Sequence, residues 1–243
     1  HDPYMINCPP HPSGGNDWAE TDEQSLNTEL ATEVSCMTAL GAEGCGIEQQ
    51  LQAVVKALER ADQGIGEFIK TDHLLTVIYV SDEEDCSIED PGLFKTPEWL
   101  SGPVYDEATP GSGHLNTACN WPEENEENYL YQTVDYYDYL VKLKQGDKEA
   151  VILGAIVGVP IGSACEGRAD QIEDCLNSPD MQYEENLHQY PNNSDAFYYG
   201  FDPACERWEG EVLYTSARPG RRFVKLAQEF GSTGYVFSIC NAD

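Results

Sequence analysis

The feature of this sequence that most constrains its fold is an apolar run that ends in a cluster of acids. Residues 74–80 are apolar except for Thr76, and they lead directly into Ser81-Asp82-Glu83-Glu84-Asp85-Cys86. Apolar runs of this length and β-branched content are typical of strands buried on both faces, in parallel sheets covered by helices. Ligands of open α/β sheets bind beyond the carboxyl ends of the strands. The acids are therefore predicted to lie at a ligand-binding edge.

Two interpretations of the acid cluster stay open. Neighbouring carboxylates repel one another, and a hard cation with oxygen ligands, Ca²⁺ or Mg²⁺, would relieve that repulsion. Alternatively, the stretch is a solvated acidic loop after a core strand.

The charge balance limits the classes of partner. The chain has 44 Asp and Glu against 13 Lys and Arg, a net charge of −31. Phosphate binding needs clustered positive charge, so neither nucleic acid nor an anionic membrane surface is an expected partner. No apolar run is long enough to predict membrane insertion. The negative charge favours cations, cationic partners or a medium of high salt concentration. Alternatively, the charge only keeps the protein soluble.

Nine cysteines without a Cys-x-x-Cys pair predict disulfides in an oxidising compartment rather than a zinc site. An odd number leaves one thiol over, which we expect to be Cys8. Spacing alone does not fix connectivity. The pairing that we propose is Cys36–Cys45, Cys86–Cys119, Cys165–Cys175 and Cys205–Cys240.

The order of elements predicts an α/β fold. Apolar residues at helical spacing indicate helices over 48–60, 129–144 and 219–230, and a weaker helical stripe covers 25–37. Apolar runs indicate further strands over 150–159 and 235–239. Such alternation builds right-handed crossovers and a parallel sheet, here of three strands. We expect one domain over 1–243, with an irregular segment at 1–24 and long loop excursions at 87–128 and 161–218.

Particular positions are predicted to face the core or a neighbouring element. Gly154 and Gly158 suggest close approach of a helix to the second strand. The inward face of the helix over 129–144 is predicted to hold Leu130, Val134, Tyr137 and Val141. That of the helix over 219–230 is predicted to hold Phe223, Leu226, Ala227 and Phe230.

Several segments together resemble a known family. They are residues 44–49 (GCGIEQ), 77–87 (VIYVSDEEDCS) and 154–160 (GAIVGVP), then Arg218-Pro219, Arg221-Arg222 and Ser238-Ile239-Cys240. In this order they resemble the later part of von Willebrand factor A-like domains in secreted proteins and lipoproteins of myxobacteria and related bacteria. The resemblance implies a Rossmann-like sheet with helices on both faces. It also implies Mg²⁺ or Ca²⁺ at an adhesion site.

The resemblance assigns candidate metal ligands. Asp82 matches the family's aspartate after the fourth strand. The family's threonine falls near residues 46–48, where Glu48 would substitute for it, and Glu83 and Asp85 are further candidates. The family's Asp-x-Ser-x-Ser motif does not occur in this chain.

The resemblance also implies an incomplete domain. The family's first strands and last helix have no counterpart here, so we expect a segment of a longer protein. The free sheet edge would then be completed by the rest of that protein, by a protein partner or by a neighbouring subunit. The alternative is a divergent relative without a working adhesion site.

Three functions follow as hypotheses. The first is an extracellular binding or adhesion module at a bacterial cell surface, dependent on a divalent cation. The second is a structural subunit of an extracellular filament or matrix. The third is a hydrolase with paired carboxylates. The chain has no Gly-x-Ser-x-Gly elbow and no His-Glu-x-x-His motif, so enzymatic activity is not expected.

Overall fold

The computed structural model describes residues 48–64, 69–92, 129–162, 164–190 and 193–241. All of them belong to one compact unit, Gly46–Asp243. The predicted helix over 25–37 and most of the predicted excursion over 87–128 lie outside the described residues.

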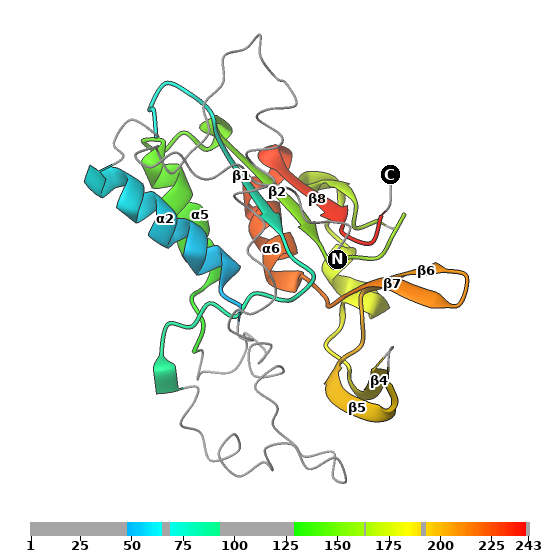
Figure 1. The fold of residues 1–243 in the computed structure, drawn as a ribbon. Helices are drawn as coiled ribbons and strands as arrows, with labels where there is room; N and C mark the ends of the chain where they lie inside the picture. Colours follow the sequence, from blue (N-terminus) through cyan, green and yellow to red (C-terminus); the bar gives the residue numbers. More distant parts are fainter. Residues whose placement is uncertain (1–47, 65–68, 93–128, 163, 191–192, 242–243) are drawn as a thin grey trace, which may run out of the picture. The chain divides into compact units, whose positions relative to one another are not determined.

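A four-stranded sheet lies at the centre of this unit, and Figure 1 shows its three parallel strands side by side. They are β1 (Leu75–Val80), β2 (Val151–Val157) and β8 (Gly234–Ser238), in that order. The predicted α/β fold with a parallel sheet is confirmed by these strands. A short fourth strand, β3 (Gly167–Arg168), pairs antiparallel with β8 and was not expected.

In the described part of the chain, three helices accompany the sheet: α2 (Gln50–Gly64), α5 (Thr133–Leu143) and α6 (Arg221–Phe230). The predicted inward face of α5 is wrong at one position: Tyr137 and Val141 pack against the core as predicted, but Val134 is 44% exposed. The residues that α5 buries are Thr133, Tyr136 and Leu140. The reason is that Leu130, from which the apolar stripe was counted, precedes the helix and forms a β-bridge with Ile88.

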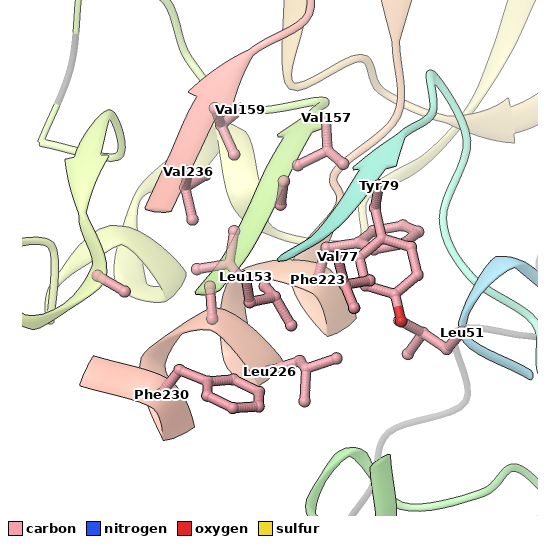
Figure 2. Close-up of a cluster of buried hydrophobic side chains, with 14 of the residues drawn as sticks. Leu51, Val77, Tyr79, Leu153, Val157, Val159, Phe223, Leu226, Phe230 and Val236 are labelled. Carbon is pink, nitrogen blue, oxygen red and sulfur yellow. The ribbon is translucent and has the colours of Figure 1, made fainter. Parts of the chain in front are cut away.

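All three helices share one core with one face of the sheet (Figure 2). Phe223 and Phe230 of α6 are fully buried, as predicted, and the ring of Phe223 lies 5.4 Å from that of Tyr79. Leu51 of α2 and Leu140 of α5 belong to the same cluster. Burial of these side chains is the main force that holds the helices against the sheet.

The opposite face of the sheet, which we call the open face, exposes residues of β1 and β8, and this corrects the prediction that β1 is buried on both faces. On that face Ile78 is 61% exposed, Val80 62% and Phe237 46%. Burial alternates along β1, β2 and β8, as in strands covered on one side only. The sequence misled because the residues on the open face are apolar too, so the run lacks the usual polar alternation.

The predicted loop over 161–218 is largely ordered secondary structure, which is a second correction. It contains the 3-10 turns η3 (Ala169–Gln171), η4 (Cys175–Asn177) and η5 (Pro179–Met181). Two hairpins follow, β4 (Glu185–Tyr190) with β5 (Asn193–Phe201), and β6 (Cys205–Glu209) with β7 (Val212–Ala217). Sequence reasoning missed them because strand propensity depends strongly on context, and these strands lie in a segment rich in polar and charged residues. Two further turns are η2 (Lys148–Ala150) and η6 (Gly231–Thr233).

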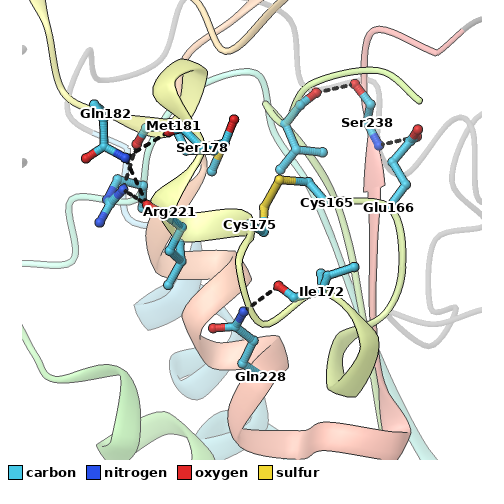
Figure 3. The surroundings of a disulfide bond; sticks show 12 residues. Cys165, Glu166, Ile172, Cys175, Ser178, Met181, Gln182, Arg221, Gln228 and Ser238 are labelled. Carbon is cyan, nitrogen blue, oxygen red and sulfur yellow. Dashed lines mark hydrogen bonds between the residues drawn. A yellow bond between two sulfur atoms is a disulfide. The ribbon is translucent and has the colours of Figure 1, made fainter. Parts of the chain in front are cut away.

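Two of the proposed disulfides are confirmed, Cys165–Cys175 and Cys205–Cys240. Figure 3 shows the first beside α6, where Arg221 donates hydrogen bonds to the carbonyls of Leu176 and Met181. Cys86 is also disulfide-bonded. The proposed partner Cys119 lies outside the described residues, as do Cys8, Cys36 and Cys45, so these pairings stay predictions.

The two glycines of the second strand region differ in their surroundings, and neither meets a helix as predicted. A Cβ atom at Gly158 would lie 1.8 Å from the carbonyl oxygen of Arg218, in the segment between β7 and α6. A Cβ atom at Gly154 would meet only Ile78, at an ordinary 3.7 Å on the open face.

We therefore expect Gly158→Ala to lower the free energy of unfolding by about 1–3 kcal/mol, because the backbone of residue 218 must shift. Gly154→Ala is the matched control and should change it by no more than about 0.5 kcal/mol. Urea unfolding of both variants measures the difference. Equal effects would contradict the close backbone approach at Gly158.

Candidate functional site

The loop after β1 divides its four acids into two groups. Asp82 and Glu83 are exposed, whereas Glu84 and Asp85 are buried, with 7% and 0% of their area exposed. The exposed acids lie at the carboxyl end of β1, the edge that the sequence predicted. The buried acids hold the loop in place.

Asp85 joins the loop to two helices. One carboxylate oxygen, Oδ1, accepts hydrogen bonds from the backbone N–H of Leu51 at 2.9 Å and the hydroxyl of Ser87 at 2.7 Å. The other, Oδ2, accepts from the backbone N–H of Ser87 at 3.1 Å and from Nε of Arg222 at 3.0 Å. Asp85 thus caps the first turn of α2 and forms a buried ion pair with α6. Both of its oxygens are engaged.

Glu84 caps the first turn of α6 in the same way. Its carboxylate accepts hydrogen bonds from the backbone N–H of Arg222 at 3.2 Å and of Asp85 at 2.9 Å, and from the Tyr183 hydroxyl at 2.6 Å. The residue before α6, Gly220, has no side chain to cap the helix. A negative charge at the start of α6 is favoured because unpaired N–H groups point toward it.

Burial nevertheless raises the pKa of Glu84 from 4.5 to about 7, against the hydrogen bond from Tyr183 and the charge of Arg222. The folded protein then holds this proton more tightly than the unfolded chain does. The stability that Glu84 contributes is therefore complete below pH 4.5 and is lost as the pH rises through about 7.

We expect the free energy of unfolding to fall between pH 5 and pH 8, by at most about 3 kcal/mol from Glu84. Glu84→Gln should flatten this slope without loss of fold. The amide oxygen of glutamine still accepts the backbone N–H groups, and its nitrogen donates to Tyr183. Urea unfolding at both pH values tests this. A variant whose slope equals that of the wild type would contradict the role of Glu84.

A second group of side chains surrounds the end of β1. Ser81 accepts a hydrogen bond from the Gln50 amide nitrogen at 2.8 Å, and the same nitrogen donates to the carboxylate of Glu48. Glu48 is held by its own carbonyl, which accepts from the N–H of Cys86 at 2.7 Å. Residues 48–50 and 81–83 are thereby brought together from separate parts of the chain.

The exposed carboxylates are close enough to affect one another's pKa. Partial burial and the charge of Asp82 raise the pKa of Glu48. Although Glu83 keeps exposed area, surrounding protein atoms raise its pKa to about 6, with smaller contributions from the charges of Asp82 and Glu48 and an opposing one from Arg218. The predicted residues Glu48, Asp82 and Glu83 thus form one acidic edge, a name we keep for these three side chains.

Neutral oxygen atoms border the acidic edge. The side-chain oxygen Oε1 of Gln50 is buried without a hydrogen-bond partner. The Ser81 hydroxyl lies between Gln50 and the backbone of Glu83. Within the described residues, no three His, Cys, Asp or Glu side chains converge as a ready-made metal site. A cation at this edge would therefore rely on these neutral oxygens as well as on the carboxylates.

Sequence reasoning missed the residues that hold the acidic edge in place: Gln50, Ser87, Tyr183 and Arg222. Ser87 and Arg222 entered only through the family resemblance, with no role attached. Asp85, the partner of Arg222, lies 137 positions earlier, and no local pattern connects the two.

Comparisons with known proteins give no independent assignment: no family model, curated protein or solved structure matches this chain. Within the described residues, no helix has the length and apolar character needed to cross a membrane.

Proposed function

We propose that the protein is an extracellular binding module of the von Willebrand factor A type, and that its acidic edge takes up Ca²⁺ or Mg²⁺. The observation that carries this proposal is the meeting of Glu48, Asp82 and Glu83 at the carboxyl end of a parallel strand. Ligands bind at this edge in open α/β sheets.

Electrostatics supports a cation rather than a neutral ligand. Burial, and to a smaller extent the neighbouring carboxylates, raise the pKa values of Glu48 and Glu83, so their negative charge is disfavoured there. A hard cation would stabilise the charged carboxylates, and carboxylate, amide and hydroxyl oxygens are the ligands that Ca²⁺ and Mg²⁺ prefer. Water or a carboxylate of the bound partner would complete the ligand shell. Asp85, the fourth candidate ligand, holds the loop in this proposal because its oxygens already have donors.

An extracellular site of action agrees with the disulfides. Cys165–Cys175 and Cys205–Cys240 both connect buried sulfur atoms, and such bonds persist in oxidising compartments. The bacterial cell surface is the specific location that we propose.

Calorimetric titration of Ca²⁺ and Mg²⁺ into the protein at pH 7.5 tests the cation. We expect saturable binding in the wild type and at least about a tenfold loss of affinity in Asp82→Asn, which keeps the shape of the side chain but removes its charge. Glu173→Gln is the matched control, since it removes an exposed carboxylate elsewhere and should leave binding unchanged. Negligible heats for both ions in the wild type would remove the cation from the proposal.

The open face of the sheet favours a second candidate function, a structural subunit of an extracellular filament or matrix. Exposed apolar area of this kind marks interaction surfaces more often than chance. Electron microscopy of native material that showed only monomers would contradict this function.

A further inference from the structure

The outer edge of β1 exposes backbone and side chains together. The N–H of Ser81 donates to the carbonyl of Ile156 in β2 at 3.1 Å. Because successive residues of a strand point in opposite directions, Leu75, Val77 and Tyr79 also direct their peptide groups toward β2. Those of Thr76, Ile78 and Val80 point away from the sheet. Among the described strands none pairs with this side of β1.

Within Leu75–Val80, β1 lacks three of the features that usually protect a sheet edge. Between Leu75 and Val80 there is no proline, no charged side chain and no bulge. Natural proteins use such features to prevent pairing with other chains. Because β1 lacks them, its edge can pair with a further extended segment.

The open face continues from the edge across the sheet. Ile78 and Val80 are more than half exposed, and Phe237 of β8 is 46% exposed on the same face. Ile152 and Ile156 of β2 lie between them and are partly exposed. A strand added beside β1 would therefore extend an apolar surface that already spans three strands.

The charge of this chain limits which partner can pair with the edge of β1. Two copies of this chain would bring together net charges of −31 each, and Asp82 and Glu83 stand directly beyond the end of β1. Repulsion therefore disfavours a second copy, whereas a basic segment would be attracted. We propose that the edge of β1 binds an extended, basic segment of a separate polypeptide, through backbone pairing at Thr76, Ile78 and Val80. This inference names the partner class for the assembly function and does not require the cation.

A fluorescent peptide, Lys-Lys-Val-Thr-Val-Ile-Val-Lys-Lys, is the probe, titrated by anisotropy against the full chain in EDTA and 150 mM salt. We expect saturable binding and slower hydrogen exchange at the amides of Thr76, Ile78 and Val80. The same peptide with methyl groups on alternate backbone nitrogens should bind at least about tenfold more weakly, because it cannot pair. A peptide with Glu in place of Lys should also weaken by at least about tenfold.

Val80→Lys and Val212→Lys are the matched variants, since these valines are 62% and 63% exposed and both changes add the same charge. Val80→Lys should abolish peptide binding, whereas Val212→Lys on β7 should not. Binding that survives both Val80→Lys and backbone methylation would be general charge attraction and would overturn the proposal. So would absence of binding, or sedimentation showing a dimer of this chain that Val80→Lys dissociates. Because EDTA is present, these outcomes do not depend on whether the acidic edge binds a cation.

Discussion

Replacing Arg222 with alanine is expected to lower the free energy of unfolding by about 3–5 kcal/mol, because Asp85 would be left as a buried, unpaired charge. Asp85 has none of its area exposed and Arg222 only 4%. The variant also loses the hydrogen bond from Arg222 to the carbonyl of Tyr131, 2.7 Å long. Urea denaturation followed by circular dichroism measures the change.

Arg168→Ala provides the control for the loss of an arginine. Arg168 pairs with Asp170 at 2.6 Å, but both side chains are about a third or more exposed, at 43% and 35%. Exposed pairs contribute little, so we expect a loss below about 1 kcal/mol. In Asp85→Asn/Arg222→Met the unpaired charge is absent, and part of the stability should return. A loss for Arg222→Ala as small as that for Arg168→Ala would contradict the buried ion pair.

Phe223→Ala should lower the free energy of unfolding by about 3–5 kcal/mol, because removal of a fully buried ring leaves a cavity between α6 and the sheet. Phe223 contacts Tyr79 of β1, and both belong to the main core cluster. Thermal or urea unfolding of the variant tests this expectation.

Phe237→Ala is the matched control, since it removes the same ring from the open face of the sheet. Phe237 is 46% exposed, so the isolated chain should lose no more than about 1 kcal/mol. An equal loss for both variants would mean that the face around Phe237 is covered in solution. That result would remove the open surface on which the proposed strand partner depends.

The acid cluster after β1 thus has two functions that its sequence does not separate. Glu84 and Asp85 cap α6 and α2, and they fix the position of the loop relative to both helices. Asp82 and Glu83 stay at the surface beside Glu48. In the proposed binding module, the buried pair holds the exposed pair in place for a ligand.

The sequence alone determined the main elements and their order, because these depend on local periodicity. The parallel strands β1, β2 and β8 and the buried face of α6 follow from apolar spacing within short windows. Cys165–Cys175, ten positions apart, was also accessible to local reasoning. The position of Asp82 and Glu83 followed from the rule that ligands bind at the carboxyl ends of strands, whereas Glu48 was a candidate only through the family resemblance.

Only the tertiary structure decided what each acid does and which sheet face is covered. Whether a carboxylate is solvated or buried depends on hydrogen-bond donors from distant segments. Here Tyr183 donates to Glu84 and Arg222 donates to Asp85. Whether an apolar strand is covered on one face or two depends on where the helices pack, and here α2, α5 and α6 share a single core. Both are long-range properties, and an apolar run or an acidic run has the same local pattern in either case.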